Sequence, residues 1–148
     1  YYEGKGVEID IQETLRLFKL SAAQGNKYAQ YNLGDMYCYG KGVNKDLQEA
    51  VRLWKLSATQ GNQDAQYELG WMYCNGEGVE IDYEEAIRLW KLSAIQGHQD
   101  AQYNLGDMYH EGKGVIQDLQ EALRLFKLSA AQGNQYAQSM LEYMLTNN

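Results

Sequence analysis

The chain has 148 residues and a formal net charge of −7, with 20 acidic side chains against 13 basic ones. This length is enough to bury a core, and no stretch approaches the ~20 apolar residues of a membrane-spanning helix. The acidic excess argues against nucleic acid or an anionic membrane surface as a partner, because phosphate groups are neutralised by clustered Lys and Arg. We therefore expect neither nucleic-acid binding nor membrane insertion.

A Gly-x-Gly-Val motif recurs along the chain every 36 residues. It stands at Gly4-Gly6-Val7, Gly40-Gly42-Val43, Gly76-Gly78-Val79 and Gly112-Gly114-Val115. A fixed period of this length is typical of a stacked repeat array. We interpret 1–148 as a single array: a partial repeat at 1–28, full repeats at 29–64, 65–100 and 101–136, and a C-terminal capping helix at 137–148.

The N-terminal part predicts an incomplete repeat. Residues 1–9 are expected to be the end of one helix and a turn, and 10–24 a helix that lacks its partner. Leu17, Phe18 and Leu20 on this helix would then be uncovered. The ends of a repeat array need a polar outer face for solubility. We expect either further repeats upstream or self-association through this truncated N-terminal edge.

The first half of each full repeat predicts a helix with one buried face. In the central repeat, Ala65, Leu69 and Met72 recur at helical spacing, with Gly70 among them. Glycine inside a helix costs roughly 1 kcal/mol relative to alanine. Because glycine recurs at the equivalent positions Gly34 and Gly106, we expect a close crossing between packed helices there.

The second half of the repeat predicts a helix with clear ends. Asp82 followed three residues later by Glu85 is typical of a helix N-cap, and Gly97 fits a left-handed C-terminal cap. The position of Trp90 carries Trp or Phe in every copy, so we expect it to fill the same hole in each core. Arg88 lies three residues after Glu85, and we expect such pairs on a solvated convex face.

These residues resemble the Sel1-like repeat family, a relative of the tetratricopeptide repeats. The shared pattern is Ala-x-x-x-Leu-Gly-x-x-Tyr, then Gly-x-Gly-Val-x-x-Asp, then Ala-x-x-Trp-x-x-x-Ala and Gln-Gly. The resemblance implies an all-α fold, a right-handed α-α superhelix (solenoid) of 36-residue helix-turn-helix repeats. It also implies a non-catalytic scaffold or adaptor that binds proteins or peptides on a concave face lined by the first helices. Two alternatives stay open: a toxin-neutralising immunity-type inhibitor, and a structural or oligomerisation segment of a longer regulatory protein.

Three equivalent positions carry Cys38, Cys74 and His110. Helix packing separates such positions by about 10 Å, whereas zinc ligands lie ~2.3 Å from one metal ion. We therefore expect unconnected surface side chains, two free thiols and no metal, cofactor or catalytic residue. Free thiols favour a reducing compartment, which predicts a cytoplasmic protein. We also expect His98, which follows a turn glycine, to be solvated.

The candidate partner-binding residues lie on the first helices, where the repeats differ in sequence. Positions i, i+4 and i+7 of each first helix share one face. Flanking positions extend it, and before the helices these are Tyr28, Asp64, Asp100 and Tyr136. The set is Tyr31, Asp35, Tyr39, Tyr67, Trp71, Asn75, Tyr103, Asp107, His110 and Glu111. This surface is aromatic and acidic, which predicts a protein or peptide partner that carries basic residues. The alternative is that the tyrosines only pack between repeats and that the variation has no function.

Overall fold

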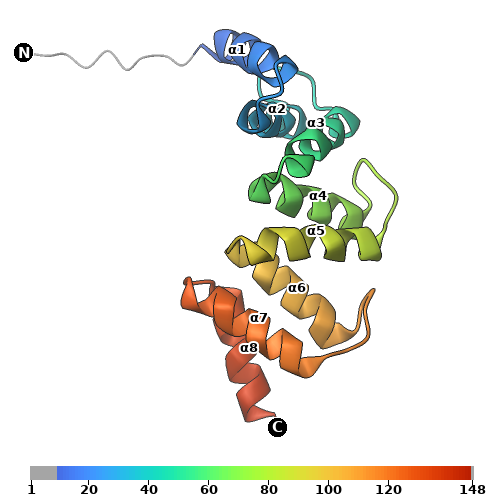
Figure 1. Ribbon diagram of the computed structural model, residues 1–148, viewed down its shortest axis with the longest axis vertical. Coiled ribbons are helices and arrows are strands. Elements are labelled where there is room, and N and C mark those ends of the chain that lie inside the picture. The colour runs from blue at the N-terminus through green and yellow to red at the C-terminus, as the bar shows by residue number, and fades with distance from the viewer. Residues whose placement is uncertain (1–9, 148) are drawn as a thin grey trace, which may run out of the picture.

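The computed structural model describes residues 10–147, and these form eight helices and no strand (Figure 1). The helices are α1 (Ile11–Ala23), α2 (Lys27–Tyr39), α3 (Leu47–Thr59), α4 (Gln63–Asn75), α5 (Tyr83–Ile95), α6 (Gln99–Glu111), α7 (Leu119–Ala131) and α8 (Gln135–Thr146). Each helix packs mainly on the helices before and after it in the chain, so helical hairpins stack one upon another. The expected all-α array of two-helix repeats is confirmed. The helix end predicted at 1–9 lies outside the described residues.

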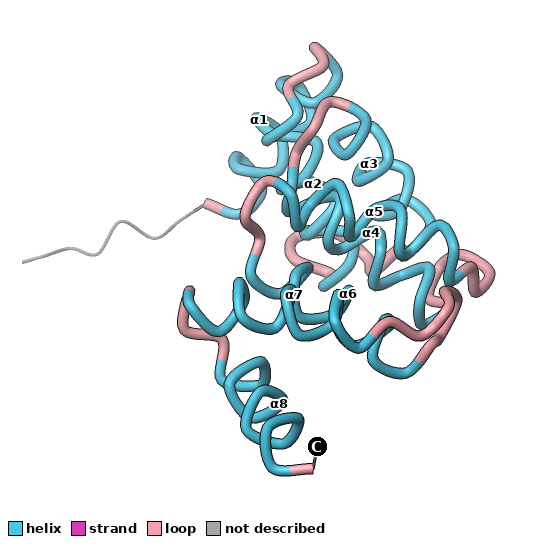
Figure 2. The backbone as a smooth tube through the Cα atoms, turned by 60° about the horizontal axis from the view of Figure 1, so that its bottom comes forward, coloured by secondary structure: helices cyan, strands magenta, loops and turns pink. Residues whose placement is uncertain are grey.

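Two kinds of turn alternate at the helix ends (Figure 2). After α4, Gly76 adopts a left-handed conformation with φ of 70°, and a loop leads to Asp82, whose side chain accepts a hydrogen bond of 3.0 Å from the Glu85 amide. After α5, Gly97 with φ of 96° makes a tight turn directly into α6. Both predicted features of the second helix, its acidic N-cap and its glycine stop, are therefore confirmed.

The close helix crossing predicted at the mid-helix glycines is present in each full repeat. A Cβ atom added at Gly70 would lie only 2.5 Å from Nε1 of Trp90, which is buried. The Trp90 indole N–H donates a hydrogen bond of 3.1 Å to the Tyr67 carbonyl, so the ring is held against the α4 backbone. A Cβ atom added at Gly34 would lie 2.6 Å from the Trp54 ring, and one added at Gly106 would lie 2.8 Å from the Phe126 ring.

The core runs continuously from one repeat into the next. Leu89 of α5 is buried in one cluster with Leu69 of α4 and Trp54 of α3. A polar contact accompanies this packing, because the Ser93 hydroxyl donates a hydrogen bond of 2.8 Å to the Gln63 carbonyl. Apolar burial thus joins α5 to both neighbouring repeats, and the buried hydroxyl of Ser93 ties it to α4; Ser57 of α3 and Ser129 of α7 make the equivalent hydrogen bonds.

The helix α1 exposes a face that the other second helices bury. Leu17 is 51% exposed, whereas the equivalent Leu53, Leu89 and Leu125 are each 2% exposed. Leu53 packs against α1 and α2 in one cluster, whereas among residues 10–147 no core cluster includes Leu17. Self-association through this edge therefore stays a prediction, and Leu17 is the residue expected to become buried in it.

We predict that Gly70→Ala destabilises the fold. The added methyl group overpacks the Trp90 site, which typically costs about 1–3 kcal/mol, against a gain of about 1 kcal/mol in helix propensity. Urea denaturation should therefore show a lower unfolding midpoint. The matched control is Glu142→Ala at the equivalent, exposed position of α8, which should change the unfolding free energy by less than about 0.5 kcal/mol. Equal stability of Gly70→Ala and the parent chain would contradict the crossing.

We predict that any self-association runs through α1. Sedimentation velocity over a wide concentration range should show a reversible larger species, and Leu17→Glu should remove it because the charge cannot be buried unpaired. The control is Leu145→Glu, an exposed apolar residue of α8, which should leave the larger species in place. A larger species that persists in Leu17→Glu would disprove this prediction, and a parent chain that remains monomeric at every concentration would show that this edge does not self-associate.

Candidate functional site

The first helices α2, α4, α6 and α8 together form one side of the array, which we call the first-helix face. All ten candidate partner-binding residues belong to α2, α4 or α6. Tyr31, Tyr67 and Tyr103 are half-buried, and each packs against a core cluster that includes the following repeat. The packing role proposed as the alternative is thus present for the tyrosine rings.

Three of the candidate partner-binding residues lie together in a groove on the first-helix face. Tyr67 and Trp71 of α4 and Tyr103 of α6 line a hollow of about 260 Å³. Four further residues complete its lining: Asp100, Asn104, Asn134 and Tyr136. We call this hollow the Trp71 groove. It spans three successive first helices, so its shape depends on the stacking of repeats.

Trp71 differs from the other two tryptophans in its surroundings. Its side chain is 44% exposed, whereas Trp54 and Trp90 are buried in the core. Tyr103, on the next first helix, lies 5.8 Å from the Tyr136 ring between centroids, at an interplanar angle of 36°. The groove therefore has aromatic walls contributed by α4, α6 and the first turn of α8.

Acidic side chains gather beside this groove. Burial, together with the neighbouring carboxylates of Asp35, Asp64 and Asp100, raises the pKa of Glu68 to about 7. Burial also raises the pKa of Asp35. The face thus concentrates negative charge where water screens it incompletely, which favours a positively charged occupant.

His98 is not solvated, and that prediction is wrong. Its side chain is only 14% exposed, and its ring stacks on Tyr67 with centroids 4.6 Å apart. Nδ1 accepts a hydrogen bond of 3.2 Å from the Ala101 amide, and Nε2 lies 3.4 Å from Asp64 Oδ1. The physical reason is that the residue after the turn glycine is the N-cap of the next first helix, a position that Asn134 occupies in α8.

Cys38, Cys74 and His110 are half-buried, so the expectation of surface side chains is corrected. Cys38 packs against the core of the following repeat and Cys74 does the same one repeat later, and burial raises the pKa of both thiols. Both cysteines are free, as predicted. The His110 ring lies 6.4 Å from Phe126 and from Tyr143 between centroids. Within residues 10–147, no cluster of three or more His, Cys, Asp or Glu side chains is placed to hold a metal ion.

Several candidates lie outside the Trp71 groove. Tyr39, Asn75 and Glu111 are exposed at the C-terminal ends of their helices, and Asp35 and Asp107 are half-buried on the first-helix face. Burial raises the pKa of Asp107, as it does for Asp35.

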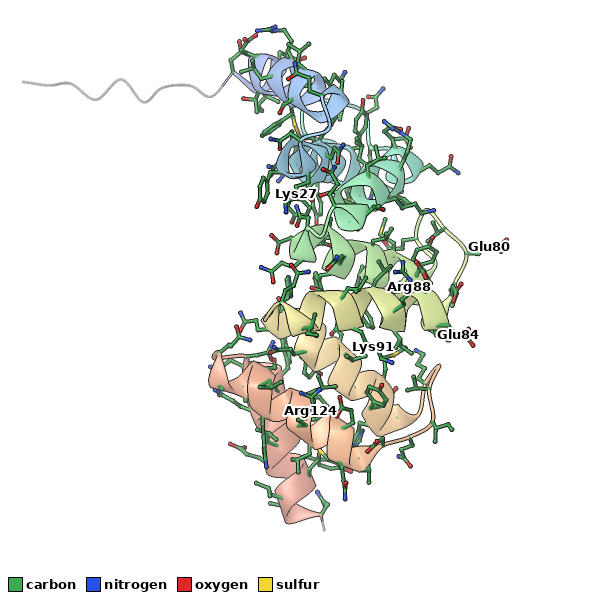
Figure 3. The ribbon with its side chains drawn as sticks, in the orientation of Figure 1. Lys27, Glu80, Glu84, Arg88, Lys91 and Arg124 are labelled. Atoms are coloured by element: carbon green, nitrogen blue, oxygen red, sulfur yellow. The ribbon has the colours of Figure 1, made fainter. Side chains whose placement is uncertain are left out.

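The second helices carry a different surface. Arg88 and Arg124 project from α5 and α7 (Figure 3), and Arg88 pairs with Glu85 at 2.6 Å. The equivalent pair on α7 joins Arg124 to Glu121 at 2.6 Å. The expected solvated surface of paired charges is confirmed.

The sequence analysis missed Glu68, Asn104 and Asn134 as parts of this site. A signal existed for Glu68, because Asp64, Glu68 and Trp71 follow one another at i, i+4 and i+7 and so share a helix face. The two asparagines gave no comparable signal, since their place in the groove depends on contacts between successive repeats.

The architecture defines an α-solenoid of two-helix repeats, and comparison identifies its family. The Sel1 repeat model matches residues 1–26, 27–62, 63–98 and 99–134. The chain belongs to the Sel1 repeat family. The expected α-α superhelix of about 36 residues per repeat is thereby confirmed. In residues 10–147, no helix is long and apolar enough to cross a membrane.

Solved structures show the same fold. A Sel1 repeat protein from Oxalobacter formigenes is 36% identical with a TM-score of 0.81, over 86% of this chain and 96% of that one. The protective antigen c5321 of uropathogenic Escherichia coli, which displays the same repeat fold, is 40% identical with a TM-score of 0.90. The alignment covers 98% of this chain but 31% of c5321, so the chain corresponds to about a third of that protein.

A more distant structure shares only the fold. Cysteine-rich protein B of Helicobacter pylori is 20% identical with a TM-score of 0.68, over 93% of this chain and 99% of that one. Among curated proteins, none matches the chain.

We predict that Glu68 lowers stability at neutral and alkaline pH. Its pKa in the fold is about 7, above its ordinary value of 4.5, so the folded chain holds a proton there that the unfolded chain releases. The free energy of unfolding therefore falls as pH rises from about 4.5 to 7, and the loss is complete above that range. Glu68→Gln should raise Tm by a few degrees at about pH 8 and change it little at about pH 4.5.

The matched control for this measurement is Glu84→Gln. Glu84 is exposed on α5, away from the first-helix face (Figure 3). Its Tm should equal that of the parent chain at both pH values. A Glu68→Gln variant whose Tm is raised equally at both pH values, or not at all, would show that the carboxylate charge is not the cause.

Proposed function

We propose that this chain is a non-catalytic scaffold that binds a protein or peptide segment on its first-helix face. Sel1 repeat proteins generally act in protein interactions and are generally non-enzymatic, which supports this class of function. We take the first-helix face to be the concave face of the array. A cytoplasmic location remains part of the proposal, supported by two thiols that are both free.

The exposed indole of Trp71 is the observation that carries the proposal. The equivalent positions hold Asp35 and Asp107, so the repeat does not require an aromatic side chain there. The core aromatic of this repeat is already Trp90, which is buried against Gly70. Trp71 is thus a large aromatic side chain that lines a groove and is not the core aromatic of its repeat. These are properties of an interface hot spot.

The charge of the face supports a partner with basic residues. Asp100 lines the Trp71 groove and Asp64 and Glu68 lie near it, and no Lys or Arg of residues 10–147 lines it. Complementary charge of this kind speeds association at low salt and disfavours acidic partners. The arginines of the second helices are already paired with glutamates of their own helices, so they do not neutralise this face.

We predict that Trp71→Ala weakens partner binding without unfolding the array. Truncation of a hot spot typically costs ~2–4 kcal/mol of binding, so affinity should fall at least about tenfold. Partners are first captured from a native cell lysate and identified by mass spectrometry, and their affinities are then measured by calorimetry. Tm should stay within about 2 °C of the parent value, because Trp71 is 44% exposed and the core aromatic of its repeat is Trp90.

The matched control is Ile95→Ala, which removes an exposed apolar side chain from the second helix α5. It should leave both affinity and Tm unchanged. If Trp71→Ala unfolds the chain, or binds the captured partners as the parent does, Trp71 is structural and the proposal loses its main support.

A further inference from the structure

We propose that the Trp71 groove binds the guanidinium group of a single arginine side chain from the partner. This inference rests on the proposed function and narrows it to one chemical group at one place. The groove measures about 260 Å³, below the ~300–1,000 Å³ of pockets that enclose small-molecule ligands. Its size therefore suits one side chain of a larger partner.

The groove offers aromatic rings that no cation of the described residues covers. Elsewhere, five tyrosine rings each have a lysine ammonium of the same chain 4.7–5.8 Å from the ring centroid: Tyr28, Tyr39, Tyr73, Tyr83 and Tyr109. Within residues 10–147, Trp71, Tyr103 and Tyr136 have no such partner. Aromatic faces attract cations, tryptophan most strongly, so these rings are free for a cation from outside.

Asp100 supplies the matching negative charge. Its Oδ1 accepts a hydrogen bond of 2.9 Å from Asn134 Nδ2, which holds the carboxylate at the groove. Within the described residues, no Lys or Arg forms an ion pair with it. A carboxylate has about four acceptor positions, so most of its capacity is available to an incoming donor. Asp64 and Glu68 add further negative charge nearby, which disfavours an acidic occupant and favours a cationic one over a neutral one.

Arginine fits this combination better than lysine. Its planar guanidinium stacks on aromatic rings, forms paired hydrogen bonds with a carboxylate and is less strongly hydrated than an ammonium. The groove presents both required surfaces, the rings of Trp71 and Tyr103 and the carboxylate of Asp100. A lysine would gain the charge attraction but not the stacking.

The preceding repeat indicates how the groove could be closed. There, His98 occupies the N-cap position and its ring stacks on Tyr67 beside Asp64. In the last repeat the same position is Asn134, beside Tyr103 and Asp100. Asn134→His should therefore place an imidazole ring over Tyr103, keep the N-cap hydrogen bond and fill the groove.

The test is a titration followed by nuclear magnetic resonance of the three indole N–H groups. Those of Trp54 and Trp90 donate hydrogen bonds in the core, whereas Trp71 is exposed, and Trp71→Phe assigns its signal. The probes are arginine, lysine and citrulline, each capped at both ends; citrulline is a neutral molecule of nearly the same shape as arginine. We expect capped arginine to shift the Trp71 signal saturably, capped lysine to bind at least about threefold more weakly, and capped citrulline not to bind.

Variants locate the binding. Asn134→His and Tyr136→Ala should each weaken binding of capped arginine at least about fivefold, because one fills the groove and the other removes a wall. Glu84→Gln, which removes an exposed acid of the second helix α5 away from the first-helix face, should leave it within about twofold. The proposal is wrong if capped lysine binds as tightly as capped arginine or if capped citrulline binds. It is also wrong if capped arginine still shifts the Trp71 signal in Asn134→His.

The outcomes separate this inference from the proposed function. If Trp71→Ala abolishes capture of the partner but capped arginine does not bind, the arginine site is wrong and the scaffold function stands. If capped arginine binds at the groove but capture does not depend on Trp71, the groove recognises arginine and the proposed partner surface is wrong.

Discussion

The contact between a second-helix aromatic ring and a first-helix glycine determines the geometry of each repeat. Trp90 lies where a side chain on Gly70 would have to be, and its indole N–H binds the Tyr67 carbonyl. This bond ties the second helix to the residue whose ring packs against the next repeat. One interaction therefore sets both the closeness of the hairpin and the position of the tyrosine from which the groove is built.

Because that contact satisfies the core, other first-helix positions are free to vary. Position 71 and its equivalents Asp35 and Asp107 carry residues of opposite character within one architecture. Beside the groove, the charged form of Glu68 is electrostatically unfavourable, since burial and three acidic neighbours raise its pKa. Groups held in an unfavourable electrostatic environment are common at functional sites, and a positively charged partner would relieve the repulsion here.

The fold was predictable from the sequence to a large extent, and the site only in part. The period, the Asp82 cap, the Gly97 stop and the crossing at Gly70 all follow from local chemistry, and the structure contains each of them. The surroundings of His98 depend on contacts between successive first helices. The periodicity of the sequence carries no information about contacts between successive repeats, so the prediction for His98 failed.

Comparison of adjacent repeats explains why the groove is local. The second residue of the first helix differs between repeats, being Tyr28 in α2, Asp64 in α4, Asp100 in α6 and Tyr136 in α8. Where His98 follows Asp64, the imidazole ring covers Tyr67 and fills the space beside it. Where a smaller asparagine follows Asp100, the hollow remains and Tyr136 forms its wall. A nearly uniform scaffold thus acquires a distinct groove through a few substitutions at the junction between repeats, and none of them alters the glycine crossing that holds the repeats together.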